Sequence, residues 1–194
     1  HSPLIDEIHD KDGMRIKALE ALTLCEAFQL TASERPGQVA HRTLDGSVEF
    51  TFGEFAARVQ ALTTGLHSLG VRRGDTVALM LVNRPEFALA DAAAMHLGAI
   101  AFSVYNTLAP EQINYLLQSS RCRVVVTERM YLPQVLAARA SEVEHIVLVD
   151  AEADGTITLA DLGRRQSRGF RFEDAWRECQ PDDVLTLIYT SGTT

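Results

Sequence analysis

The residues best suited to chemistry lie together in residues 185–194, LTLIYTSGTT. Four hydroxyl side chains and one glycine follow an apolar, β-branched stretch there: Thr190, Ser191, Gly192, Thr193 and Thr194. Each hydroxyl can donate one hydrogen bond, and glycine lets backbone N–H groups approach a ligand closely and form an anion-binding concavity. This segment therefore predicts a site for an oxyanion, and the expected ligand is a nucleotide phosphate.

The position of the segment supports the phosphate interpretation more than its composition does. Residues 184–188 predict a buried strand, and α/β proteins bind ligands at the carboxyl ends of their strands. The pattern G-x-x-x-x-G-K-[ST] is absent, no lysine follows, and runs of Thr, Ser and Gly also occur in plain turns. A role for Ser191 as an acyl-enzyme nucleophile is not favoured, because the G-x-S-x-G pattern is missing.

The elements expected to position this segment alternate between strands and helices. Residues 76–82, TVALMLV, are continuously apolar, as in a strand covered on both faces. Further strands are expected at residues 99–104, 123–127 and 145–149, with helices at 83–97, from Pro110 onward and at 131–140. This rhythm predicts an α/β fold with a mainly parallel sheet flanked by helices. Residues 151–180 are less regular and predict a surface connection.

The part before this alternation predicts helices and a hairpin. Thr23 with Glu26 fits a capping box for a short helix to about residue 33. Asp45–Gly46 is a signal for a two-residue hairpin turn. A second capping box precedes an apolar stripe at helical spacing, formed by Thr51 and Glu54 and then by Phe55, Val59, Leu62, Leu66 and Leu69. The predicted division is an arm at 1–22, an α/β subdomain at 23–180, and a further strand with the phosphate segment at 181–194.

Two groups of side chains have both a structural and a functional interpretation. Tyr105, Asn106 and Thr107 follow a predicted strand, so they could face a ligand cleft or cap the next helix, and capping is favoured. His67 and His96 lie late in predicted helices, where an imidazolium would meet a favourable dipole, and a structural role is favoured for both. No histidine pairs with another at metal-ligand spacing, so no metal site is predicted.

The composition excludes several classes of protein. The net charge of −8 argues against an electrostatic surface for nucleic acid, and no apolar stretch is long enough to span a membrane. The start of the chain lacks the apolar core of a signal peptide. Three widely separated cysteines, Cys25, Cys122 and Cys179, predict neither a disulfide framework nor a zinc site. These features together predict a cytoplasmic location.

The segment LTLIYTSGTT resembles the phosphate-loop signature of the adenylate-forming acyl-CoA synthetases, the superfamily that also holds the luciferases and the adenylation domains of peptide synthetases. In the family the loop continues with Gly, a variable residue and Pro-Lys-Gly, and this sequence ends before that continuation. Residues 50–100 are similar to the family's first helix–strand–helix block. Residues 103–117 and 123–128 resemble the next block, in the style of the long-chain fatty-acid subgroup. The match runs from about residue 23 to residue 194.

The resemblance implies the front part of the large N-terminal domain of a fatty-acid–CoA ligase. A fatty carboxylate would attack the α-phosphate of ATP, with Mg²⁺ neutralising the phosphates, and CoA thiol would then displace AMP. Thr190, Ser191, Gly192, Thr193 and Thr194 would hold the β- and γ-phosphates. The family's adenine contacts, its Mg²⁺-binding glutamate and its catalytic lysine all lie downstream, so the 194-residue chain alone is expected to be inactive.

Several alternatives stay open beside the fatty-acid–CoA ligase. A fatty acyl-AMP ligase would hand the acyl group to a carrier protein instead of CoA. A non-catalytic α/β module would bind a partner or nucleotide without turnover, and a flavodoxin-like redox domain would fit the strand–helix rhythm but predicts bound flavin. Neither peripheral contact with a membrane nor a homo-oligomer is decided by the sequence, and no partner of the nucleic-acid class is expected.

Overall fold

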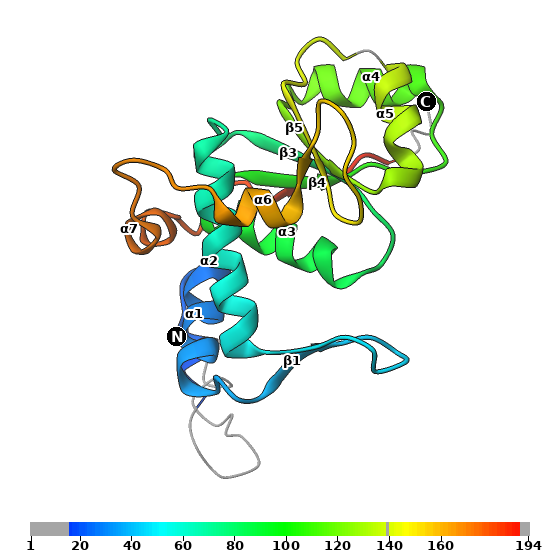
Figure 1. Ribbon diagram of the computed structural model, residues 1–194. Coiled ribbons are helices and arrows are strands. Elements are labelled where there is room, and N and C mark those ends of the chain that lie inside the picture. Colours follow the sequence, from blue (N-terminus) through cyan, green and yellow to red (C-terminus); the bar gives the residue numbers. More distant parts are fainter. Residues whose placement is uncertain (1–15, 139, 191–194) are drawn as a thin grey trace.

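A six-stranded sheet lies at the centre of the molecule in a computed structural model that describes residues 16–138 and 140–190 (Figure 1). All pairings within this sheet are parallel, and the strand order is β7-β6-β5-β3-β4-β8. The strands are β3 (Thr76–Met80), β4 (Ile100–Ser103), β5 (Val124–Thr127), β6 (His145–Leu148), β7 (Ile157–Thr158) and β8 (Thr186–Leu187). The predicted α/β fold with a mainly parallel sheet is confirmed.

Helices cover both faces of this sheet, and successive residues of its central strands point to opposite layers. In β3, Val77 and Leu79 belong to one apolar cluster, whereas Ala78 and Met80 belong to the other. The first cluster includes residues of α2 (Phe52–Ser68) and α3 (Pro85–His96), and the second includes residues of α4 (Pro110–Ser119) and α5 (Leu132–Ala138). Because helices cover both faces of β3 and β5, the sequences of these strands are continuously apolar.

The helix α2 forms as its sequence predicts. The Thr51 side chain accepts from the Glu54 backbone N–H (3.3 Å), and the Glu54 carboxylate accepts from the Thr51 backbone N–H (2.9 Å). This reciprocal capping box satisfies two N–H groups that the helix itself cannot pair. The stripe of Phe55, Val59, Leu62, Leu66 and Leu69 is buried, so α2 presents its apolar face to the core.

A short helical segment and a hairpin precede α2. They comprise η1 (Lys17–Glu20), α1 (Leu24–Glu34), β1 (Val39–Arg42) and β2 (Glu49–Thr51), and β1 pairs antiparallel with β2. The predicted two-residue turn is wrong: the Thr43 backbone N–H reaches the Val48 carbonyl, which leaves a four-residue loop between them. The Asp45 carboxylate stabilises this longer loop, because it accepts from the Thr43 hydroxyl and from the N–H and hydroxyl of Ser47.

Residues 151–180 contain more structure than a surface connection. Besides β7, they form α6 (Leu159–Arg164) and α7 (Phe172–Arg177). Leu162 of α6 is buried against α2, where Gly65 has no Cβ, and a Cβ built there would overlap the Leu162 carbonyl oxygen. The elements were missed because they are short, and their position depends on this close contact rather than on a local pattern. A further short helix, η2 (Arg129–Tyr131), precedes α5.

His96 is buried in the core, at the end of α3. Its Nδ1–H donates to the Ala92 carbonyl (2.7 Å), so its Nε2 accepts from the Gln29 side-chain amide (3.0 Å). Burial lowers the pKa of His96 to about 4, so the ring is neutral at neutral pH. Its structural role fits the prediction, but the idea of a cation at the helix end is wrong. Within the described residues, no helix has the length and apolar character needed to cross a membrane.

Candidate functional site

The strand β8 brings the hydroxyl-rich segment to one edge of the sheet. It pairs in parallel with β4, with Ala101 opposite Thr186 and Phe102 opposite Leu187. The Thr186 hydroxyl also donates to the Ala101 carbonyl (2.7 Å). Thr190 follows β8 and is exposed at the carboxyl end of the sheet. The other predicted site residues, Ser191, Gly192, Thr193 and Thr194, lie outside the described residues.

The prediction that residues 184–188 form a buried strand is wrong in two respects. The strand spans only Thr186–Leu187, and the flanking apolar residues are largely exposed, Leu185 at 46% and Ile188 at 80%. The physical reason is that β8 is the last strand of the sheet, so only its β4 side has a strand neighbour. An apolar run shows that a strand forms but does not show what covers it.

Tyr189 fixes the chain immediately before Thr190. Its ring packs against Phe102, with 5.6 Å between the ring centroids and a tilt of 58°. Its hydroxyl lies 3.2 Å from the hydroxyl of Ser119, at the end of α4. Ile188 is exposed and Tyr189 packs inward, so these two contacts of Tyr189 anchor the chain immediately before the hydroxyl-rich segment.

A cavity of about 790 Å³ lies beside Thr190, and we call it the β8–α4 cavity. Its lining comprises Tyr105, Leu108, Glu111, Gln112, Tyr115, Leu116, Ile188, Tyr189 and Thr190. The wall is largely apolar and aromatic, with polar groups at a few points, which is the usual character of a small-molecule site. Tyr105 and Tyr115 are both exposed, so their rings are accessible to a ligand.

Tyr105, Asn106 and Thr107 do not cap α4, so the favoured interpretation of these residues is wrong. The N-cap residue of α4 is Ala109, whose backbone N–H donates to the Gln112 side chain. The Asn106 amide instead donates to the Tyr131 hydroxyl (2.6 Å), which links the end of β4 to η2. Tyr105 lines the β8–α4 cavity, in agreement with the alternative that this stretch faces a cleft.

A cluster of charged side chains lies at the same carboxyl end of the sheet, next to the strands β3, β5 and β6 rather than next to β8. Arg84 lies 2.8 Å from Glu86, 3.0 Å from Glu128 and 3.7 Å from Asp150. Glu128 is buried, and its carboxylate also accepts from the Val82 N–H (2.7 Å). The hydrogen bond from Arg84 to Glu86, together with Glu128, raises the pKa of the guanidinium.

This cluster ties the ends of β3, β5 and β6 together, and the Arg84 guanidinium pairs with the buried Glu128 carboxylate. Sequence analysis missed it because its members are far apart in the chain. Among the residues that the structure describes, no group of three or more His, Cys, Asp or Glu side chains could hold a metal ion.

The architecture places the chain among α/β proteins with a parallel sheet covered on both faces, the class whose ligands bind at the carboxyl ends of the strands. The family of AMP-binding enzymes matches residues 28–194, which includes the hydroxyl-rich segment. The chain therefore belongs to the AMP-binding enzyme family.

Individual relatives agree with this family. An uncharacterized protein of Mycobacterium tuberculosis is 48% identical over 128 residues, which cover 66% of this chain and 73% of that protein. 4-Coumarate–CoA ligase 3 of Oryza sativa subsp. japonica is 30% identical over 170 residues, 88% of this chain and 29% of that ligase. The chain thus spans less than a third of this CoA ligase.

Solved structures share the fold. The anthranilate CoA ligase AuaEII, in complex with anthranoyl-AMP, has a TM-score of 0.75 at 27% identity, over 87% of this chain and 31% of that chain. A Mycobacterium tuberculosis fatty acyl CoA synthetase has a TM-score of 0.71 at 27% identity, over 84% of this chain and 32% of that chain. The fold is therefore that of the N-terminal domains of acyl-CoA synthetases.

Proposed function

We propose that this chain is the N-terminal part of an ATP-dependent fatty-acid–CoA ligase, in which Thr190, Ser191, Gly192, Thr193 and Thr194 hold the β- and γ-phosphates of ATP. The observation that carries the proposal is the family match, which runs through this segment. The exposed position of Thr190, after β8 and beside the β8–α4 cavity, supports it.

In the proposed reaction, a carboxylate oxygen of the acid attacks the α-phosphorus of ATP, and pyrophosphate leaves. The sulfur of CoA then attacks the acyl carbon, and AMP leaves. Hydroxyl and backbone N–H donors in the segment would stabilise the charge that develops on the departing pyrophosphate. The role of the described chain is positioning: Tyr189 and β8 hold the first residue of the segment against the sheet.

The described residues fit a phosphate better than a metal ion. Thr190 offers a hydroxyl at the sheet edge, whereas no described cluster of His, Cys, Asp or Glu could hold a metal. In this proposal Mg²⁺ would arrive with the phosphates of ATP, and the resemblance to the family implies that a glutamate later in the family's sequence would bind it.

The test is ATP–pyrophosphate exchange by the longest protein product of the gene, with acids of increasing chain length. Ser191→Ala should reduce the rate about 10- to 100-fold, because one charge-assisted hydrogen bond contributes roughly 1.5–3 kcal/mol. Ser141→Ala is the matched control, since that exposed serine lies between α5 and β6, far along the sheet from β8. Equal exchange rates in the two variants would remove Ser191 from the phosphate site.

A second candidate substrate class is an aromatic acid. It is favoured by the similarity to ligases whose names specify 4-coumarate and anthranilate. The exchange assay therefore includes both aromatic acids beside the fatty acids, and a preference of at least tenfold assigns the class. Replacing CoA by an acyl carrier protein in the second half-reaction separates a CoA ligase from a fatty acyl-AMP ligase.

A further inference from the structure

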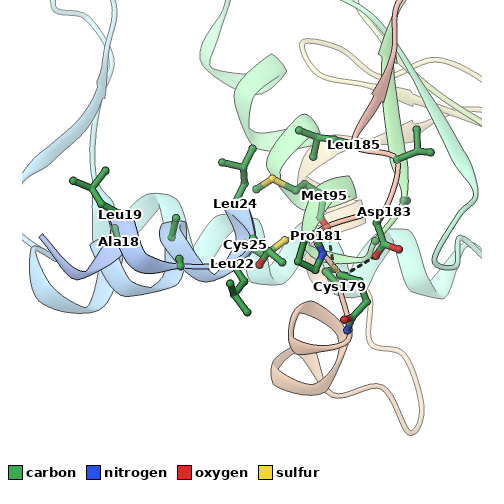
Figure 2. A pocket seen from close by; sticks show the side chains of 17 residues that line it. Ala18, Leu19, Leu22, Leu24, Cys25, Met95, Cys179, Pro181, Asp183 and Leu185 are labelled. Atoms are coloured by element: carbon green, nitrogen blue, oxygen red, sulfur yellow. Dashed lines mark hydrogen bonds between the residues drawn. The ribbon is translucent and has the colours of Figure 1, made fainter. Parts of the chain in front are cut away.

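Two cysteines that are far apart in the sequence meet at one backbone carbonyl group. Cys25 lies in the first turn of α1, and Cys179 follows α7. The Cys25 Sγ is 3.3 Å from the Met95 carbonyl oxygen, and the Cys179 Sγ is 3.6 Å from the same oxygen (Figure 2). The distance between the two sulfur atoms is therefore smaller than the sum of these two distances.

We propose that Cys25 and Cys179 form a dithiol oxidation site, which closes to a reversible disulfide when the protein meets a peroxide. A disulfide needs sulfur atoms about 2.05 Å apart, so a rotation of one or both side chains must complete the approach. Cys25 lies on α1 and Cys179 lies in the connection after α7, and both sulfur atoms approach the Met95 carbonyl oxygen. The inference starts from this geometry and does not depend on the proposed ligase activity.

A small oxidant has access to the pair. The two cysteines line a cavity of about 370 Å³ between the start of α1, the end of α3 and the connection from α7 to β8 (Figure 2). Cys25 is 3% exposed and Cys179 is half-buried, so the pair has one protected and one accessible thiol. Cys122 differs from both, because it is fully buried and its thiol donates to the Val124 carbonyl (3.1 Å).

The two thiols also differ in acidity: the pKa of the more accessible Cys179 is lowered, and that of the buried Cys25 is raised. The hydrogen bond between them raises the pKa of Cys25 and lowers that of Cys179, and burial raises that of Cys25 further. The positive charge of Arg73 helps to lower the pKa of Cys179, while partial burial and the charges of Asp183 and Glu178 oppose it. The accessible Cys179 is therefore the thiol that ionises first, and the thiolate is the nucleophile in such chemistry.

The oxidation proceeds in two steps. The Cys179 thiolate attacks one oxygen of hydrogen peroxide, the O–O bond breaks and hydroxide leaves, which gives a sulfenic acid on Cys179. The Cys25 sulfur then attacks the Cys179 sulfur, the S–S bond forms, and the hydroxyl group leaves with the Cys25 proton as water. In total two thiols and one peroxide give one disulfide and two waters, and a dithiol such as dithiothreitol reverses the change by exchange.

The disulfide would join α1 to the segment that leads into β8. That segment is already held by Asp183, whose carboxylate accepts from Arg73 Nε (3.0 Å) and Nη2 (2.6 Å) and from the Gln180 N–H (2.9 Å). Because the new bond would close a very long loop of chain, the oxidised protein should unfold at a higher temperature than the reduced protein.

The experiment treats the full chain with hydrogen peroxide, blocks the remaining thiols with an alkylating reagent, and maps the peptides by mass spectrometry without reduction. The matched variants are Cys25→Ser, Cys179→Ser and the control Cys122→Ser. We expect an intramolecular Cys25–Cys179 peptide in the wild-type protein and in Cys122→Ser, its loss after dithiothreitol, and its absence from the other two variants. In Cys25→Ser, the sulfenic acid on Cys179 should persist and react with dimedone.

Two results would overturn the proposal. One is over-oxidation of Cys179 to sulfinic acid while Cys25 in the same chains remains fully alkylated. The other is that disulfides form only between chains or through Cys122. The wild-type map decides the question even if a serine variant folds poorly, and no step of the experiment requires ATP or an acid, so failure of the ligase assay leaves this result unaffected.

Discussion

The two edges of the sheet are formed by equally short strands, β7 and β8, but the chain packs around them in different ways. Both β7 and β8 span only two residues. The chain after β7 turns at once into α6, which buries Leu162 against α2 with a contact so close that Gly65 has no room for a Cβ. The chain around β8 instead leaves Val184, Leu185 and Ile188 exposed. The chain that follows β7 therefore packs into the core, and we call this side the covered edge, whereas the chain around β8 presents apolar side chains to solvent, and we call this side the exposed edge.

The difference suggests that the covered edge contributes mainly to stability, whereas the exposed edge is available for ligand binding. A covered edge contributes buried apolar area, whereas an exposed apolar edge contributes little and is a surface that further polypeptide or a ligand can cover. The proposed phosphate segment lies at the exposed edge, beside the β8–α4 cavity. The chain passes from one edge to the other through α7, where Phe172 stacks against His96 with 5.6 Å between ring centroids.

The largest expected effect is at the covered edge. Leu162→Ala should lower the free energy of unfolding by about 2–5 kcal/mol, because a fully buried leucine leaves a cavity when it is truncated. Leu136→Ala is the control, since this leucine of α5 is exposed. Chemical denaturation of both variants measures the difference. A loss below about 1 kcal/mol for Leu162→Ala would mean that α6 is not tightly packed.

The second effect is the pH dependence of stability that His96 causes, since this histidine packs against α7 between the two edges. The pKa of His96 is lowered from 6.5 in the unfolded chain to about 4, so the folded state favours the neutral ring. This contribution is fully present above pH 6.5 and is lost as pH falls from 6.5 towards 4, and it amounts to roughly 3 kcal/mol. His96→Leu should flatten that part of the stability profile. His67→Gln is the companion variant, since burial lowers the pKa of His67 as well.

The third effect concerns the contact between α2 and α6. Gly65→Ala places a Cβ against the Leu162 backbone, which cannot give way as a flexible side chain can, so about 1–3 kcal/mol of stability should be lost. Gly163→Ala is the matched control, because its Cβ would meet only ordinary contacts at 3.8 Å or more. Thermal unfolding of the two variants compares them, and equal midpoints would contradict the close approach of the helices.

The sequence predicted the parts of the fold that carry a local pattern. The α2 stripe, its Thr51–Glu54 capping box and the parallel strands are examples, because periodicity and capping are visible within one element. Residues 157–164 were missed, since a two-residue strand and a six-residue helix are too short to show a period. The exposure of Ile188 and the meeting of Cys25 with Cys179 depend on tertiary neighbours, which no local pattern records.

The smallest effect is expected at the exposed edge itself. Ile188→Thr keeps a β-branched residue after β8 but removes apolar surface, and it should change the free energy of unfolding by no more than about 0.5 kcal/mol, because Ile188 is 80% exposed. Leu187→Ala is the paired variant, since Leu187 packs on the cluster that includes Phe102 and should cost more. Denaturant titration of both variants therefore measures how much of β8 the chain covers. If Ile188→Thr proved as costly as Leu187→Ala, the chain would itself cover this edge, and the contrast with the β7 edge would disappear.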